Sequence, residues 1–269
     1  MSTWTDARSR NFGSIAELYE RVRPGYPVES VDWLLGDSTG SRPRRVADVG
    51  TGTGKLTDAL LTAGHEVTAV DPDPAMLAVL SAKHPRVPTV AGTAEQLPFD
   101  DAASHTAGFE PADFEAAGFE AAGFDAVTFG QSWHWVDPPR GSAEVARILR
   151  PGGILGLFWN IRDDREPWVA ELADILDHRS ADELMLASGG PIVTEPFTFD
   201  ETATFDWVST IDVDTLVDLA ATHGFVLTAS DEERTAMLDG VRALGERVAG
   251  DDGLLRLPYR LRVYRFIRG

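Results

Sequence analysis

The sequence predicts an α/β fold in which a mostly parallel sheet is covered by helices on both faces. Short apolar runs alternate with helical patterns from about residue 44 to residue 178. Strands that are apolar along their whole length and alternate with helices are typical of a parallel sheet that is buried on both sides. A second observation is the glycine-rich turn at 50–54, which lies between the first apolar run and the first helical pattern. Glycines there let the backbone pass close to a ligand, so this turn is the expected binding site.

Five strands and the helices between them are expected in the regular part of the chain. The strands are predicted at 45–49, 66–70, 87–91, 124–129 and 154–159. The helices are predicted at 54–63, 74–83, 138–149 and 166–178. Pro74 supports the start of the second of these helices, because proline suits the first helical turn.

The segments on either side of this pattern are expected to cover the site and to complete the sheet. Residues 1–40 are predicted to form an N-terminal helical cap, with helices at 11–22 and 28–35 separated by the proline-rich turn at 23–27. Residues 41–269 are predicted to form the main domain. Its tail is expected to contain strands at 197–207 and 254–267 and helices at 214–222 and 232–248.

A five-residue unit is repeated four times at 106–125, in the order TAGFE, PADFE, AAGFE and AAGFD. A period of five residues fits neither a helix face nor strand alternation. We therefore expect 104–123 to be a surface loop that was inserted before the fourth strand. The alternative is a substrate lid that carries Phe109, Phe114 and Phe119.

The composition excludes several classes of protein. The formal net charge of −19 disfavours nucleic acid and anionic membranes as partners. There are no cysteines, which excludes disulfides and thiolate metal sites, and the histidine spacing indicates no metal site. The longest apolar run is too short to cross a membrane, and the N-terminus does not look like a secretory signal. We expect a cytoplasmic protein that is a monomer or a homodimer.

The residues around the glycine turn indicate the chemistry of the ligand. Asp48 precedes Gly50, Gly52 and Gly54, and an acid at that position suits a cationic group and would repel a pyrophosphate. Asp71 ends the next strand, where a carboxylate can hold both hydroxyls of a ribose. The expected ligand therefore has a ribose and a positive group, and no phosphate.

Four motifs in this order resemble those of the class I S-adenosylmethionine-dependent methyltransferases. The turn at 48–54 resembles their first motif, and the stretch at 70–76 resembles their second. The stretches at 91–99 and 149–153 resemble the adenine-contacting loop and the turn before the fifth strand. The resemblance implies a Rossmann-like fold with a seven-stranded, mostly parallel sheet and an antiparallel last strand.

The resemblance also implies S-adenosylmethionine as cofactor and assigns residues to it. Asp48 and the turn residues would hold the methionine part, Asp71 the ribose, and the residues that follow Asp71 and the third strand would border the adenine. Gln131 would lie near the methionine part or the transferred methyl group. The implied cofactor residues are Asp48, Gly50, Thr51, Gly52, Gly54, Asp71, Pro72, Met76, Thr93, Ala94, Glu95 and Gln131.

Two further stretches, at 19–27 and 131–137, resemble the subgroup that includes trans-aconitate methyltransferase-like enzymes. The expected acceptor-binding residues are Tyr19, Arg23, Tyr26, Trp133, Trp135 and Arg162. His134 is the candidate general base or orienter of the acceptor, and its alternative role is to pack between Trp133 and Trp135. Methyl transfer from a sulfonium can proceed through alignment alone, so no base is strictly required.

The predicted function is transfer of a methyl group from S-adenosylmethionine to an oxygen, nitrogen or carbon of a small-molecule acceptor. An NAD(P)-dependent oxidoreductase is an alternative for this sheet, although the glycine spacing differs from the dinucleotide fingerprint. A non-catalytic S-adenosylmethionine-binding protein is the other alternative, because cofactor motifs do not establish an acceptor site.

Overall fold

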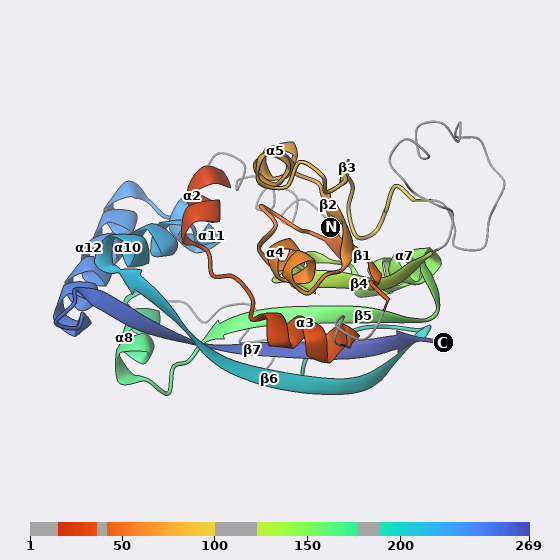
Figure 1. The fold of residues 1–269 in the computed structure, drawn as a ribbon. Coiled ribbons are helices and arrows are strands. Elements are labelled where there is room, and N and C mark those ends of the chain that lie inside the picture. The colour runs from red at the N-terminus through yellow and green to blue at the C-terminus, as the bar shows by residue number, and fades with distance from the viewer. Residues whose placement is uncertain (1–15, 37–41, 100–122, 177–188) are drawn as a thin grey trace.

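The computed structural model describes residues 16–36, 42–99, 123–176 and 189–269. A seven-stranded sheet with the order β3-β2-β1-β4-β5-β7-β6 runs through the molecule (Figure 1). Its strands are β1 (Arg45–Val49), β2 (Glu66–Asp71), β3 (Thr89–Ala91), β4 (Phe124–Gly130), β5 (Leu149–Arg162), β6 (Phe197–Asp212) and β7 (Leu254–Arg268). The α-helices are α2 (Ala16–Val22), α3 (Val28–Leu35), α4 (Lys55–Thr62), α5 (Pro74–Lys83), α7 (Pro138–Ile148), α8 (Pro167–Ile175), α10 (Val213–Ala221), α11 (Gly224–Thr228) and α12 (Asp231–Val248), and η2 (Trp133–Trp135) is a 3-10 turn.

The strand directions confirm the predicted topology. β1 pairs in parallel with β2 and with β4, and β4 pairs in parallel with β5. β7 lies between β5 and β6 and is antiparallel to both. The last strand is therefore the antiparallel one. The carboxyl ends of β1, β2, β4 and β5 meet at one edge of the sheet, where ligands bind in folds of this kind.

The helices begin where local sequence chemistry favours them. Asp73 caps α5 by accepting a hydrogen bond from the amide of Ala75, and Pro74 occupies the first helical position. Asp137 caps α7 in the same way. α12 begins with a capping box formed by Ser230 and Glu233. Each cap satisfies a backbone donor that the first helical turn leaves unpaired.

Three apolar clusters hold the layers together. One packs α7 against β1, β4 and β5, and a second packs α3 and α4 against the sheet. The third joins α8, α10 and α12 to the first half of β7. In Figure 1, α2 lies beside the group of α10, α11 and α12, so the N-terminal helix and the tail meet near the carboxyl end of β5.

Several predicted boundaries differ from the structure. β5 spans 149–162 rather than 154–159, because its antiparallel pairing with β7 continues as far as Arg162. β6 continues to Asp212, paired with β7 over nearly its whole length. The predicted helix at 11–22 is described only from Ala16, and all but the last residue of the predicted loop at 104–123 lies outside the described residues. The two short elements η2 and α11 were not predicted.

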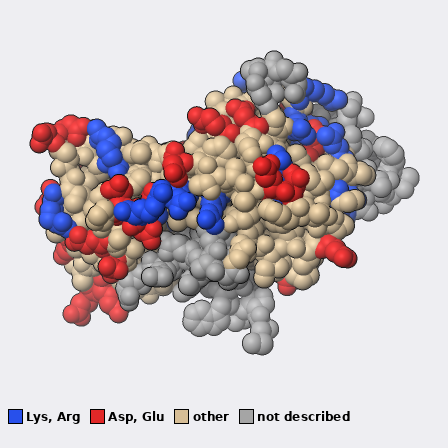
Figure 2. All heavy atoms as spheres, turned by 90° about the horizontal axis from the view of Figure 1, so that it is seen from below, with Lys and Arg blue, Asp and Glu red and all other residues tan. Residues whose placement is uncertain are grey.

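The surface carries charges of both signs. On the face shown in Figure 2, acidic and basic side chains lie in small interspersed groups, and neither sign covers the whole face. Within the described ranges, no helix combines the length and the apolar character that crossing a membrane requires.

Candidate functional site

The glycine turn between β1 and α4 has the backbone geometry that its sequence predicts. Gly50, Gly52 and Gly54 have φ values of 64°, 56° and 89°, which side-chain-bearing residues rarely adopt. A Cβ added to Gly52 would meet nothing within 4 Å, so this residue lies against open space. A Cβ on Gly54 would lie 2.8 Å from Leu80, which shows that Gly54 allows close packing of α5. Gly52 is therefore placed for a ligand, whereas Gly54 serves the fold.

Asp48 is buried at the end of β1, and three threonine hydroxyls surround it. Thr51 and Thr57 donate to its Oδ2 at 2.9 and 2.7 Å, and Thr128 donates to Oδ1 at 3.0 Å. Burial raises the pKa of Asp48 to about 6, against the opposing effect of these hydrogen bonds. The carboxylate is therefore rigidly held, and it is mostly charged at pH 7.

Asp71, at the end of β2, is tied to the glycine turn. Its Oδ2 accepts a hydrogen bond from the Gly52 amide at 2.8 Å, and its Oδ1 accepts one from the Asp73 amide at 2.8 Å. The side chain is largely buried, and burial raises its pKa to about 6. Each oxygen has a further lone pair, so the carboxylate can also accept hydrogen bonds from two vicinal hydroxyls.

A cleft lies over the turn at the carboxyl edge of the sheet. It brings together the glycine turn, the segment that follows α2, and the ends of β4 and β5. Its lining residues are Tyr19, Arg23, Pro24, Tyr26, Asp48, Gly50, Thr51, Gly52, Lys55, Leu56, Gly130, Gln131 and Asn160. Eight residues expected from the sequence at the cofactor or acceptor site are in this lining: Tyr19, Arg23, Tyr26, Asp48, Gly50, Thr51, Gly52 and Gln131.

Gln131 and Asn160 close the cleft at the ends of β4 and β5. Gln131 has a φ of 57°, and its Nε2 donates to the Asn160 carbonyl at 3.0 Å. Its Oε1 is buried and has no hydrogen-bond partner among the described residues. The Asn160 side chain donates to the Gly25 carbonyl at 2.9 Å and accepts from Trp207 Nε1 at 3.0 Å. The linking role of Asn160 is visible only in the fold.

Tyr19, Arg23 and Tyr26 reach the cleft from the N-terminal segment. The Arg23 guanidinium lies 4.9 Å from the centre of the Tyr19 ring. The Tyr26 ring meets Phe158 edge-on, with 5.9 Å between centroids. A Cβ on Gly130 would lie 2.9 Å from the Tyr26 hydroxyl oxygen, so Tyr26 can occupy this position only beside a glycine.

The Trp-His-Trp stretch does not form a wall of this cleft. Trp133 is 2% exposed and belongs to the core, where its ring lies 4.8 Å from Phe129 and its Nε1 donates to the Ile192 carbonyl. Trp133 therefore lies in the core and outside the described cleft, and its part in acceptor binding stays a prediction. Trp135 is 37% exposed and stacks obliquely against His134, and neither lines the cleft. The role of His134 stays a prediction.

The residues expected at the adenine lie beside β2 and β3. Met76 and Ala94 are buried, whereas Pro72 and Thr93 are exposed. The Glu95 side chain accepts a hydrogen bond from the Asp137 amide, which joins this loop to the start of α7. None of these five residues lines the described cleft, so their contacts with adenine stay predictions.

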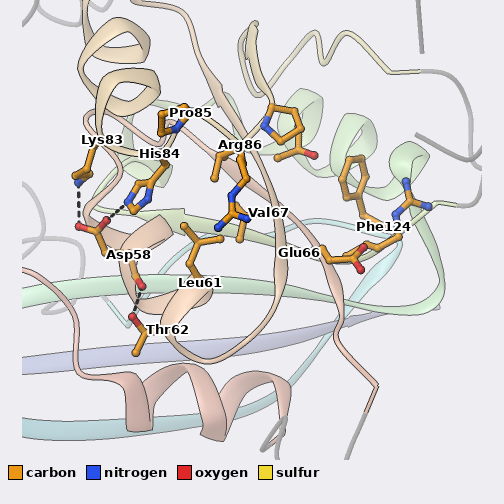
Figure 3. A pocket seen from close by; sticks show the side chains of 14 residues that line it. Asp58, Leu61, Thr62, Glu66, Val67, Lys83, His84, Pro85, Arg86 and Phe124 are labelled. Carbon is orange, nitrogen blue, oxygen red and sulfur yellow. Dashed lines mark hydrogen bonds and ion pairs between the residues drawn. The ribbon is translucent and has the colours of Figure 1, made fainter. Parts of the chain in front are cut away.

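A larger hollow of about 760 Å³ lies at the opposite edge of the sheet, at the amino ends of β1, β2 and β4 (Figure 3). Two of its basic side chains are paired: Figure 3 shows Lys83 and His84 directed at Asp58, at 2.9 and 2.6 Å. It shares no lining residue with the cleft and contains none of the predicted site residues. We therefore place the functional site at the cleft.

Two residues of the tail lie near Arg23 and Arg162. His223 follows α10, and burial, followed by the charges of Arg23 and Arg162, lowers its pKa well below the usual value. Tyr259 of β7 is 4% exposed and pairs across the strands with Arg162. No spacing in the sequence indicates that these residues meet, because they are brought together by α10 and by the antiparallel strand.

Comparison with known proteins identifies the family. A family model for methyltransferase domains matches residues 47–155, which include the end of β1, the glycine turn and β4. An uncharacterized methyltransferase of Mycobacterium tuberculosis is 41% identical over 259 residues, and the alignment covers 93% of each chain. A demethylmenaquinone methyltransferase of Chlorobaculum tepidum is 34% identical over 162 residues, covering 54% of this chain and 59% of that protein.

A solved structure supports the fold independently. It is a protein of Anaeromyxobacter dehalogenans described as a type II methyltransferase, with a TM-score of 0.61 and 21% identity, and the match covers 90% of this chain and 97% of the other. The similarity over nearly the whole chain to the mycobacterial protein shows the family, and the glycine turn with Asp48 and Asp71 lies inside the matched region. The chain belongs to the class I S-adenosylmethionine-dependent methyltransferases.

Proposed function

We propose that the cleft binds S-adenosylmethionine and that the protein transfers its methyl group to a small-molecule acceptor. The observation that carries this proposal is the hydrogen bond between Asp71 and the Gly52 amide, which fixes a ribose-binding carboxylate beside an open glycine turn. Asp48 and the buried Oε1 of Gln131 supply negative charge and an acceptor for an ammonium group. Such a ligand carries no pyrophosphate, so its site does not need a cluster of basic residues.

The residues present fit this cofactor. Asp71 would accept hydrogen bonds from the ribose hydroxyls, and Asp48 and Gln131 would hold the amino group, directly or through water. When bound, S-adenosylmethionine supplies a methyl group on a positively charged sulfur. The protein would align the acceptor with that methyl group and exclude water, with Tyr19 and Tyr26 of the N-terminal segment covering the cleft.

Calorimetry with S-adenosylhomocysteine and with NADH tests the cofactor assignment on the full chain. We expect S-adenosylhomocysteine to bind and NADH not to bind, and we expect Asp71→Ala to abolish the binding. Binding of NADH without binding of S-adenosylhomocysteine would overturn the proposal in favour of an oxidoreductase. Transfer of a labelled methyl group to members of a panel of acids, phenols, amines and indoles then separates an enzyme from a non-catalytic binding protein.

A further inference from the structure

Glu20 lies in α2 between two residues that line the cleft. Tyr19 precedes it, Arg23 follows it by three residues, and both line the cleft beside the glycine turn. The Arg23 amide donates to the Tyr19 carbonyl at 3.0 Å, so the three residues belong to one helical turn. A contact that fixes Glu20 therefore also fixes the two side chains that this turn contributes to the cleft.

The Glu20 carboxylate connects α2 to two other helices. Its Oε1 accepts a hydrogen bond from Lys55 Nζ at 3.2 Å and another from Lys83 Nζ at 2.9 Å. Lys55 is the first residue of α4, directly after the glycine turn, and Lys83 is the last residue of α5. Lys83 also donates to Asp58 of α4 at 2.9 Å (Figure 3). One carboxylate therefore joins α2 to the helices that follow β1 and β2.

These ion pairs are more shielded from water than the ion pair of the neighbouring Arg21. The side chains of Glu20, Lys55 and Lys83 are 23%, 20% and 25% exposed. Arg21 pairs with Asp218 of α10 at 2.7 Å, and these two side chains are 67% and 40% exposed. Exposed pairs contribute little, whereas removing one partner of a shielded pair leaves a charge without its counter-ion. We therefore expect Glu20 to hold α2 in place more firmly than Arg21 does.

The surroundings of Glu20 favour its charged form. Burial acts to raise the pKa of Glu20, but the Thr53 hydroxyl and the ammonium groups of Lys83 and Lys55 outweigh this effect, so the pKa lies below its ordinary value. Glu20 is therefore ionised at pH 7. Thr53 belongs to the glycine turn, so the same carboxylate also lies next to the turn itself.

The position of Lys55 gives this pairing a consequence for the cleft. Lys55 lines the cleft together with Asp48. An uncompensated positive charge on Lys55 would repel a cationic ligand, and like charges repel more strongly where water is partly excluded. Glu20 supplies the opposite charge to Lys55, so the negative charge of Asp48 stays available to such a ligand.

We infer that Glu20 is a positioning residue of the cofactor site, which holds α2 against the glycine turn and neutralises Lys55, so that the cleft favours a positively charged sulfur. This inference rests on the proposed function, because it takes the cleft as the site of S-adenosylmethionine. S-adenosylhomocysteine lacks the transferred methyl group and hence the positive charge on sulfur. Loss of the α2 contact should weaken both ligands, whereas loss of the neutralisation should weaken S-adenosylmethionine more.

Calorimetry with both ligands on the full chain measures these two effects. Glu20→Gln keeps the size of the side chain and removes its charge. We expect the Kd of S-adenosylhomocysteine to rise at least fivefold, and the Kd of S-adenosylmethionine to rise at least threefold more than that. Amide hydrogen exchange at 16–23 should become faster in the ligand-free variant while exchange in β4 stays unchanged, which separates loss of the α2 contact from general destabilisation.

Lys83→Gln tests the same link from outside the cleft. Lys83 is not part of the cleft lining, so it can change ligand binding only through its partners. We expect Lys83→Gln to raise the Kd of both ligands to the same extent, because Lys55 keeps its counter-ion. The effects of Glu20→Gln and Lys83→Gln should be less than additive in the double variant. Raising the salt concentration from about 0.05 M to about 0.5 M should weaken S-adenosylhomocysteine binding more in the unaltered protein than in Glu20→Gln.

Arg21→Gln is the matched control, because it removes an exposed ion pair of the same helix and should leave both Kd values within twofold. The inference is overturned if Glu20→Gln binds S-adenosylhomocysteine as well as the unaltered protein does, if Arg21→Gln has an equal effect, or if Glu20→Gln weakens both ligands equally. If Glu20→Gln does not fold, an unchanged Kd in Lys83→Gln overturns the inference. Failure of S-adenosylhomocysteine to bind the unaltered protein would instead overturn the proposed function.

Discussion

The carboxylate of Asp71 accepts a hydrogen bond from the backbone amide of Gly52 at a distance of 2.8 Å. This contact joins the end of β2 to the turn that follows β1, so the two elements of the proposed cofactor site hold each other in place. The same carboxylate also accepts from the amide of Asp73, which caps α5. One side chain therefore links the turn, the second strand and the following helix.

Replacing Asp71 by asparagine should disrupt this link. Asparagine has one acceptor oxygen, so the amide of Gly52 or that of Asp73 would face an NH₂ group and lose its partner. An unpaired buried amide costs about 1–3 kcal/mol. We expect the free energy of unfolding in urea to fall by that amount, with weaker binding of S-adenosylhomocysteine. Asp73→Asn is the control, because asparagine caps a helix as well as aspartate does, and an equal effect there would contradict the interpretation.

The raised pKa values of Asp48 and Asp71 predict a dependence of stability and binding on pH. An acid whose pKa is higher in the folded protein than in the unfolded chain stabilises the fold when it is protonated. This stabilisation is complete below the ordinary pKa of 3.8 and is lost as the pH rises through about 6. For Asp48 the difference corresponds to about 3 kcal/mol. As the pH rises from 4 to 7, the unaltered protein should therefore lose stability relative to Asp48→Asn, measured as the difference between their free energies of unfolding.

Ligand binding should show the opposite trend. A ligand that carries an ammonium group favours the charged form of Asp48, so the affinity for S-adenosylhomocysteine should increase as the pH rises through about 6. Calorimetry between pH 5 and pH 8 measures this change, and Asp48→Asn should both weaken binding and flatten the profile. An affinity that does not change with pH in the unaltered protein would show that the charge of Asp48 does not contribute.

The contact between Gly130 and Tyr26 predicts a steric effect at the cleft. A Cβ at position 130 would lie 2.9 Å from the Tyr26 hydroxyl oxygen, closer than carbon and oxygen normally approach. Gly130→Ala should therefore displace Tyr26, cost about 1–3 kcal/mol of stability and weaken S-adenosylhomocysteine binding. Gly25→Ala offers a matched control in the same segment, since its Cβ would meet nothing within 4 Å and its φ is not positive.

Asn160 connects the N-terminal segment to the sheet, which predicts a local effect on mobility. Asn160→Asp replaces the donor to the Gly25 carbonyl by an oxygen, so this hydrogen bond is lost while the acceptor for Trp207 remains. We expect faster amide hydrogen exchange at 23–27, measured by mass spectrometry. Trp207→Phe removes only the other hydrogen bond and should leave exchange at 23–27 unchanged. Equal effects of the two substitutions would mean that Asn160 acts through general stability.

The sheet, the glycine turn and the family could be predicted from local features of the sequence. These features depend on local chemistry: apolar runs form buried strands, glycines permit positive φ, and an acid before the turn and another 21 residues after Gly50 sit at adjacent strand ends. The structure agrees at β1 and α5 to the residue. Parallel strands bring their carboxyl ends to one edge by construction, so Asp48 and Asp71 could be placed without coordinates.

Other neighbourhoods in this protein depend on the tertiary structure. The turn of η2 buries Trp133 against Phe129, which the sequence does not indicate. His223 and Tyr259 carried no signal, because α10 and the antiparallel β7 bring them to Arg23 and Arg162 across separations of up to 236 residues in the chain. Such contacts follow from how the tail packs on the sheet, and no local spacing encodes that packing. The glycine turn with Asp48 and Asp71 therefore follows from local motifs, whereas the surroundings of Arg23 and Arg162 depend on long-range packing.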